Sequence, residues 1–289
     1  MKLPPFEIHR PASLADASRM LLDLGDDAVA VNGGTELLLA MKLGLASYGH
    51  LVDLKGVAEL RGTSNGGGTL SIGAGMTHHA LETSAQVNAA LPALTAMLRK
   101  VANLRVRSVG TIGGNLCFAD PHSDPATFLA AMGASFVLGD GRNSRTLPAE
   151  AFLRGPYETV LEAGELLVAV EIPLPDKTSG LSHVRMKTHE RPTVTVGARI
   201  ELEKGAVASA RVAVGSVVGV PFLADSLEPL VGAGPDLWSD RVGACASATA
   251  AGIEPVADAD GSSEYKRALV EVFVRRGLEA ALASALSAA

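Results

Sequence analysis

Two glycine-rich segments place the strongest constraint on this chain. They read Val31-Asn-Gly-Gly-Thr-Glu36 and Gly110-Thr-Ile-Gly-Gly-Asn115, and each follows a short apolar or β-branched stretch. Glycine tolerates positive φ and lets a ligand approach the backbone closely, and successive amides in such a turn form a concave anion site. Either segment alone could be an ordinary glycine corner. Two of similar design predict one ligand with a long anionic middle, such as a dinucleotide diphosphate.

The composition indicates a folded protein of two or three domains. The 289 residues are 47% apolar, carry a net charge of −6 and contain no basic run. Nucleic-acid binding is therefore excluded, because phosphates require clustered Lys and Arg, and single strands require stacking aromatics. Prolines and Glu7 interrupt the N-terminus before a signal peptide could form, and no stretch approaches the ~20 apolar residues that span a bilayer. We expect no membrane span and a cytoplasmic location.

The cysteines and histidines predict no metal site in this chain. Cys117 and Cys245 lie far apart and form no CxxC pair, so they cannot hold a zinc ion or an iron–sulfur cluster unaided. His78 and His79 are adjacent and cannot face the same direction. One of them could approach a cofactor, although a surface position is the simpler expectation.

The hydrophobic pattern predicts strands and helices that carry the glycine segments. Ser13 suits the start of the first helix and Gly25 its end. Thr35 is placed to cap a second helix, and Asp124 a later one that Gly133 ends. We expect strands at 28–31, 50–54, 69–73, 104–109, 136–138 and 166–172, and further helices at 13–24 and 90–101.

The chain changes character after residues 172–180, where proline, glycine and small polar residues concentrate and indicate a linker. Antiparallel strands are expected at 193–201 and 209–215, joined around Lys204-Gly205. Helices are expected near 223–230, 238–251 and 264–286.

Catalytic constellations are missing from the sequence. No nucleophile elbow or Ser/His/Asp arrangement is recognisable, and no P-loop lysine follows either glycine segment. Arg105 and Arg107 alternate on the expected strand 104–109, where a solvated face is the simpler explanation, although one of them could screen phosphate charge. The chain is equipped to hold a cofactor, and we assign it no catalytic residue.

The two glycine segments, with the sequel Asn115-Leu-Cys-Phe-Ala-Asp-Pro-His-Ser-Asp-Pro125, resemble the FAD-binding medium subunit of the molybdenum hydroxylases. This is the family of the carbon monoxide dehydrogenase and xanthine dehydrogenase flavoproteins. The resemblance extends to Tyr265–Arg276, which is similar to the family's closing helix. It implies an α+β fold with two small α/β FAD-binding subdomains, at 1–56 and 57–176. A C-terminal domain at 177–289 would contain a three-stranded antiparallel sheet and a helical bundle.

The resemblance also implies which residues contact the FAD. Leu167 and Lys187 are looser matches near the flavin ring, where a lysine would stabilise the anionic reduced ring. Asn32 stands where an alanine is common, and the segment after Lys187 lacks an aspartate often found there. The implied cofactor contacts are Val31, Asn32, Gly33, Gly34, Thr35, Glu36, Thr111, Gly113, Gly114, Asn115, Ser123, Asp124, Leu167 and Lys187.

The function implied is electron transfer within a larger complex. An iron–sulfur small subunit and a molybdenum large subunit would be the partners, in a dimer of heterotrimers, and would carry the molybdenum cofactor and the clusters. A stand-alone flavin oxidase and a non-catalytic nucleotide-binding scaffold remain the alternatives. The substrate and the electron acceptor stay open, because substrate chemistry would lie in another polypeptide.

Overall fold

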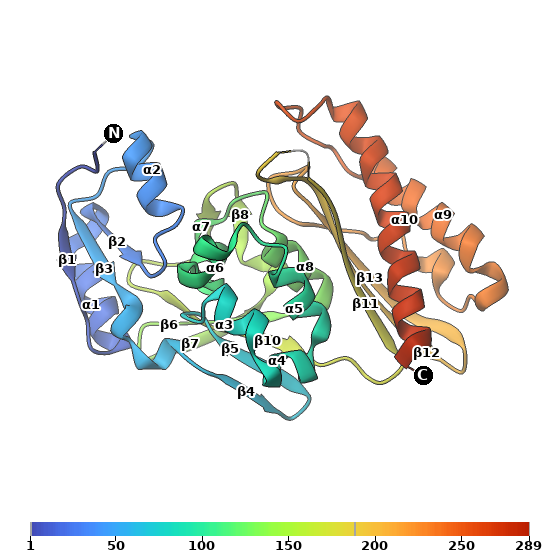
Figure 1. The fold of residues 1–289 in the computed structure, drawn as a ribbon, viewed down its shortest axis with the longest axis horizontal. Coiled ribbons are helices and arrows are strands. Elements are labelled where there is room, and N and C mark those ends of the chain that lie inside the picture. The colour runs from blue at the N-terminus through green and yellow to red at the C-terminus, as the bar shows by residue number, and fades with distance from the viewer. Residues whose placement is uncertain (1, 188, 289) are drawn as a thin grey trace. The chain divides into compact units, whose positions relative to one another are not determined.

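The computed structural model describes residues 2–187 and 189–288. The chain forms two compact units, shown as ribbons in Figure 1. The first unit comprises Met1–Ala90, Leu98–Ala119 and Ser135–Ile172, and the second comprises Leu91–Met97, Asp120–Ala134 and Pro173–Ala289. The expected α+β class is confirmed. The division at residues 56 and 176 stays a prediction.

A three-stranded parallel sheet forms the N-terminal part of the first unit. Its order is β1 (Glu7–His9), β3 (His50–Asp53), β2 (Ala28–Val31). Helix α1 (Leu14–Leu24) packs on the sheet, and its Leu14 and Ala17 share a core cluster with Val52. As predicted, the Ser13 side chain caps α1, and Gly25 ends the helix with a positive φ of 60°. This sheet delivers the first glycine segment at the end of β2.

A five-stranded sheet forms the rest of the first unit. Its order is β4 (Thr63–Gly66), β5 (Thr69–Gly73), β10 (Leu166–Pro173), β6 (Ser135–Gly139), β7 (Ser144–Pro148). The sheet is accompanied by the short hairpin of β8 (Leu153–Gly155) and β9 (Glu158–Thr159), and by short helices between β5 and β6. These helices are α3 (His78–Thr83), α4 (Ala85–Ala90), α6 (Leu104–Val109) and α7 (Ile112–Phe118). Helix α5 (Pro92–Leu98), which follows α4 in the chain, belongs almost entirely to the second unit.

Two local predictions in the first unit are wrong, and a third, in the second unit, holds with shorter bounds. The expected strand 104–109 is the helix α6, because Asn103 caps it by accepting from the Val106 amide and so outweighs the β-branched residues. The helix expected over 90–101 is observed as the shorter α5, which begins at Pro92, where the missing backbone N–H is tolerated in the first helical turn. Thr35 caps nothing, since helix α2 (Leu37–Leu43) begins after Glu36 without a side-chain cap.

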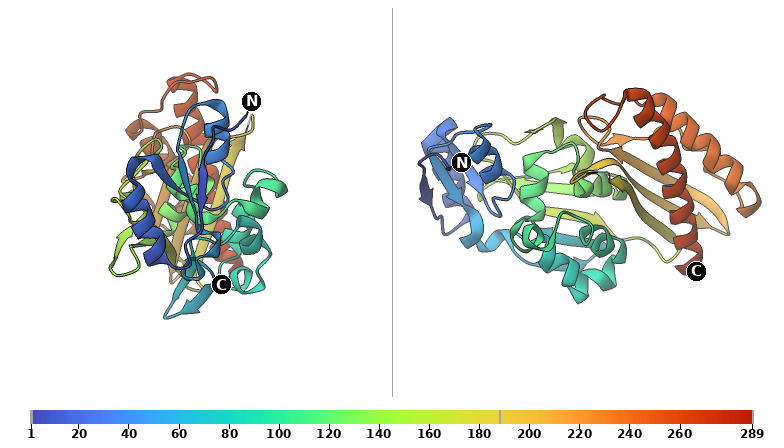
Figure 2. Two further views of the ribbon diagram at one scale, coloured as in Figure 1. Left: turned by 90° about the vertical axis from the view of Figure 1, so that its left-hand side faces the viewer. Right: turned by 45° about the horizontal axis from the view of Figure 1, so that its top comes forward.

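The second unit is an antiparallel sheet with helices on both faces. Its order is β11 (Ser179–Lys187), β12 (Pro192–Glu203), β13 (Ala206–Gly215), β14 (Phe222–Leu223). The turn at Lys204-Gly205 is as predicted. Helices α9 (Trp238–Gly252) and α10 (Ser263–Ala288) confirm two further predictions, and the right-hand view of Figure 2 shows α10 lying along the sheet.

Alternation along β12 separates its two faces. Val194, Val196 and Ala198 belong to the cluster that α10 completes with Val270 and Val274, and Cys245 of α9 lies in the same core, as expected. On the opposite face, a Cβ on Gly197 would lie 2.8 Å from the Ala131 methyl group of α8 (Asp124–Met132).

The helix expected at 223–230 is absent from the described residues. Phe222–Leu223 pairs with β13 instead, and only a 3₁₀ turn at Glu228–Leu230 follows. Sheet pairing thus overrides the helical pattern there. Among the described residues, no helix combines the length and apolarity needed to cross a membrane.

Candidate cofactor site

A cavity of about 590 Å³ lies within the first unit, in the size range of small-molecule sites. Residues from both glycine segments line it, together with residues from α1, β2, α7 and the start of β10. The predicted cofactor contacts that line this cavity are Val31, Asn32, Gly33, Gly34, Thr35, Glu36, Thr111, Gly113, Gly114, Asn115 and Leu167.

The two glycine segments touch each other at this cavity. A Cβ on Gly33 would overlap the carbonyl oxygen of Val109 and lie 2.7 Å from the Cα of Gly110. Glycine is therefore required at position 33 for the backbones to approach. Segments distant in sequence meet along one wall of the cavity.

The first segment is open to a ligand. No acceptor among the described residues takes the amide hydrogens of Gly33, Gly34 and Thr35. Gly34 has a φ of 69°, which other residues adopt only with strain. Backbone amides need partners, so these groups are ready donors for an anionic ligand.

The second segment is closed, contrary to the expectation of a matching turn. It forms the start of helix α7, and the Thr111 hydroxyl caps it by accepting from the Gly114 amide at 3.0 Å. The Gly113 amide donates to the carbonyl oxygen of Ala74 at 2.8 Å, and a Cβ on Gly113 would lie 2.6 Å from the Ala74 methyl group. Gly113 therefore allows close packing against Ala74, and the amides of Gly113 and Gly114 already have acceptors within the protein.

The described lining of the cavity holds acidic side chains but no lysine or arginine. None of the described residues that line it is a lysine or an arginine, whereas Asp26, Glu36, Glu162 and Glu165 are acidic. An anionic group bound beside the glycine segments would rely on neutral donors, namely amides, hydroxyls and the residue described next.

His78 lines the cavity although a surface position was the simpler expectation. It opens helix α3, which Thr77 caps, and only 2% of the residue is exposed. Its backbone amide donates to the Gly110 carbonyl oxygen at 2.9 Å. Burial, with the nearby positive charge of Arg107, lowers the pKa of His78 to about 4, and Glu82 opposes the shift. The sequence signal was Thr77, whose capping position predicts that the two histidines begin a helix and therefore point in different directions.

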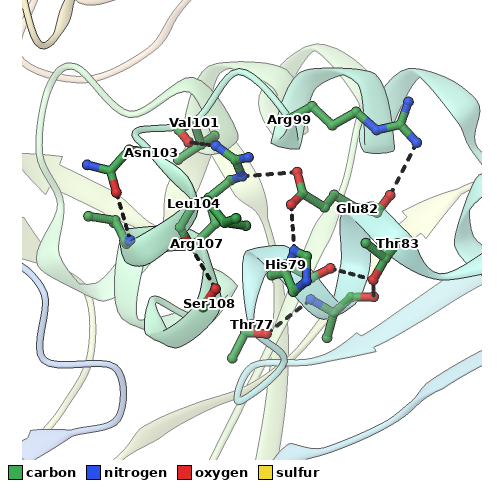
Figure 3. A network of polar contacts seen from close by, with 12 residues as sticks. Thr77, His79, Glu82, Thr83, Arg99, Val101, Asn103, Leu104, Arg107 and Ser108 are labelled. Atoms are coloured by element: carbon green, nitrogen blue, oxygen red, sulfur yellow. Dashed lines mark hydrogen bonds and ion pairs between the residues drawn. The ribbon is translucent and has the colours of Figure 1, made fainter.

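An ion-pair network joins the buried Glu82 carboxylate to His79 and Arg107 (Figure 3). The Glu82 carboxylate accepts from His79 Nδ1 at 2.8 Å and pairs with Arg107 Nε at 3.0 Å. Burial alone would raise the pKa of Glu82, but the hydrogen bonds from His79 and Arg107 hold it below its usual range. Arg107 also donates to the Val101 carbonyl oxygen at 3.0 Å. Arg107 thus links α6 to α3, and is not on a solvated strand.

Cys117 is a cavity-lining thiol without metal-binding or nucleophilic character. Burial raises its pKa to about 12, although a hydrogen bond from the backbone of Leu167 acts in the opposite direction. A thiol with such a pKa is neutral and unreactive at pH 7. This agrees with the expected role as a small residue beside the ligand.

The remaining predicted contacts belong to the second unit and do not line this cavity. Ser123, and not Asp124, caps α8, by accepting from the Ala126 amide. Asp124 lies just inside the helix, where it pairs with His183 at 3.2 Å and with Arg185. Burial raises the pKa of Asp124, but His183 and Arg185 lower it below its usual range. Lys187 is exposed at the end of β11, and Thr188 lies outside the described residues.

Two family comparisons cover nearly the whole chain. Residues 4–175 match the FAD binding domain in molybdopterin dehydrogenase, and residues 181–281 match the CO dehydrogenase flavoprotein C-terminal domain. The chain belongs to the FAD-binding medium subunits of the molybdenum hydroxylases. It is an oxidoreductase subunit with an FAD-binding domain, as the resemblance implied.

Relatives of this medium subunit align over almost their full length. The chain is 34% identical to the carbon monoxide dehydrogenase medium chain of Afipia carboxidovorans, covering 97% of this chain and 98% of that one. It is 31% identical to the glyceraldehyde dehydrogenase medium chain of Sulfolobus acidocaldarius, covering 96% and 98%. In structure it resembles a chain of the Hydrogenophaga pseudoflava carbon monoxide dehydrogenase, with a TM-score of 0.94, 34% identity and coverage of 98% and 99%.

Proposed function

We propose that this subunit binds FAD in the cavity of the first unit and transfers electrons within a molybdenum hydroxylase. The bound flavin would accept electrons from iron–sulfur clusters of a partner subunit and pass them to an external acceptor. The observation that carries the proposal is the wall where the unsatisfied amides of Gly33, Gly34 and Thr35 meet the second glycine segment.

The two segments would contact the same FAD molecule with different groups. The first would donate its backbone amides to the diphosphate, with Asn32 and Glu36 at its edges. The second would give Thr111 and Asn115 as side-chain contacts, and Gly113 and Gly114 as backbone surface. Val31 and Leu167 would supply apolar surface. Ser123, Asp124 and Lys187 stay proposed contacts on the strength of the family resemblance.

Partners and location are part of the proposal. We propose an iron–sulfur small subunit and a molybdenum large subunit, assembled as a dimer of heterotrimers in the cytoplasm. Curated relatives are medium chains of dehydrogenases, which supports a multi-subunit complex. Leu39, Leu43 and Leu45 on or beside α2 are exposed large apolar residues of the kind that subunit interfaces bury.

The test is reconstitution of the full chain with FAD. We expect one FAD per chain, released into the supernatant on denaturation, and bleached and restored by dithionite and reoxidation. Thr35→Val removes a hydroxyl from the open segment and should weaken FAD binding. Thr146→Val, on exposed strand β7, makes the same exchange outside the cavity and should leave binding unchanged.

Three outcomes would contradict the proposal. A chain that binds no FAD lacks the assigned cofactor. Flavin that stays with the precipitate supports an oxidase with covalent flavin. Bound flavin that exchanges no electrons with the partner clusters supports a structural role.

A further inference from the structure

We propose that His78 binds the diphosphate of FAD as a neutral hydrogen-bond donor, through Nε2, where the two glycine segments meet. This inference rests on the proposed function, because it requires the cavity to hold a dinucleotide. It assigns a contact that neither glycine segment supplies.

The ring of His78 lies at the junction of the two segments. A Cβ on Gly110 would lie 3.5 Å from His78 Cδ2 and 3.5 Å from the Thr35 hydroxyl oxygen. Cδ2 is bonded to Nε2, so the ring edge that carries Nε2 is the edge beside Gly110. The backbone bond from His78 to the Gly110 carbonyl, and the bridge between Thr77 and Thr111, hold it there.

The environment of the other ring nitrogen fixes the tautomer. Nδ1 is buried and has no hydrogen-bond partner among the described residues. A buried N–H without an acceptor loses a full hydrogen bond and costs about 1–3 kcal/mol. The proton therefore resides on Nε2, and Nε2 is the nitrogen through which His78 reaches a ligand.

Burial keeps His78 neutral, and the charge of a neighbour adds to the effect. Burial first, and then the positive charge of Arg107 on α6, lower the pKa of His78, while Glu82 on α3 opposes the shift and is already engaged by Arg107 and His79. The other titratable groups lining the cavity are Asp26, Glu36, Cys117, Glu162 and Glu165. A neutral imidazole donates one hydrogen bond to a phosphate oxygen without adding a charge.

The acidic lining explains why this donor matters. With no lysine or arginine among the described lining residues, the diphosphate depends on neutral donors for its hydrogen bonds. The amides of Gly33, Gly34 and Thr35 approach from one segment, and His78 approaches from α3 beside the other. Donors on both sides of the meeting point would enclose the phosphate oxygens.

The decisive experiment measures the affinity of the full apo-chain for FAD, ADP and riboflavin, by flavin fluorescence and calorimetry. A hydrogen bond to a charged group predicts that His78→Leu weakens FAD and ADP binding about 10- to 100-fold. Riboflavin, which lacks the diphosphate, should bind both proteins alike. His78→Gln keeps an N–H donor of similar reach and should recover most of the affinity. His79→Gln, beside it but outside the cavity lining, is the matched control.

The pH dependence separates a neutral donor from a charged one. A neutral imidazole predicts an FAD affinity that stays constant between pH 6 and pH 8 apart from changes shared with His78→Gln. A charged imidazole would lose about tenfold in affinity per pH unit above its pKa, a slope absent from the variant, and that result would overturn the assignment.

Other results also decide the matter. If His78→Leu and His78→Gln bind FAD as tightly as the wild type, the inference is wrong while the proposed function stands. If riboflavin affinity falls as much as FAD affinity, the contact is with the flavin ring and the diphosphate assignment is wrong. If the wild-type chain binds no FAD, the proposed function itself fails.

Discussion

The two glycine segments contain similar residue types, but they have different physical roles. Asn32–Glu36 follows a strand and leaves the amides of Gly33, Gly34 and Thr35 without acceptors among the described residues. Gly110–Asn115 follows a helix, begins another, and has the amides of Gly113 and Gly114 satisfied within the fold. The first segment is built to receive a ligand, and the second to let other backbone approach.

This difference shows that a glycine pattern alone does not identify a phosphate site. Glycine removes a side chain, and the space is taken either by a ligand or by neighbouring protein. At Gly113 the neighbour is Ala74, whose methyl group would lie only 2.6 Å from a Cβ on that glycine. The two cases differ in whether the backbone amides of the segment already have hydrogen-bond acceptors within the protein.

The largest expected effect concerns His78, which the second segment holds in place. Its pKa is lowered to about 4, so the unfolded chain takes up a proton first as the pH falls below about 6.5. The folded chain therefore loses about 3 kcal/mol of stability from this group between pH 7 and pH 4. Urea denaturation of the apo-chain should show this loss for the wild type and not for His78→Gln. Parallel pH profiles for the two proteins would contradict the burial of a neutral histidine.

The next largest effect is a difference in the free energy of unfolding between substitutions at two adjacent glycines of the second segment. Gly113→Ala forces a methyl group against the Ala74 backbone and should cost about 2–3 kcal/mol. Gly114→Ala meets only the Thr111 hydroxyl, at 2.9 Å, and gains helix propensity, so the change should stay within about 1 kcal/mol. Chemical denaturation measures both. Equal costs would show that the second segment is not packed as described.

The smallest effect compares the threonines of the two segments. Thr111→Ala removes the cap of α7 and should lower the free energy of unfolding by about 1 kcal/mol. Thr35→Ala removes no cap, so its stability should match the wild type within about 0.5 kcal/mol, while its FAD affinity falls. Thermal unfolding of the apo-proteins tests the first expectation. A stability loss at Thr35 as large as that at Thr111 would remove the distinction between the segments.

Periodicity predicted the elements whose stability comes from their own amphipathic pattern. The helix α1 with Ser13 and Gly25 at its ends, the strands β2, β3 and β5, and the helices α9 and α10 all lie where the sequence placed them. Predictions failed where a neighbour decides the local structure. Asn103 caps residues 104–109 as a helix, and Arg107 of this helix forms an ion pair with Glu82. Phe222–Leu223 forms a strand because it pairs with β13.

The sequence by itself determined the family, the FAD-binding domain and the order of the two glycine segments. Motif order is a property of the chain, so no tertiary information was needed. Only the tertiary structure decided which segment has free amides, that Gly33 packs against Gly110, and that His78 lies inside. Those features depend on which residues distant in sequence form hydrogen bonds with one another or pack against one another. The sequence pattern does not specify these partners.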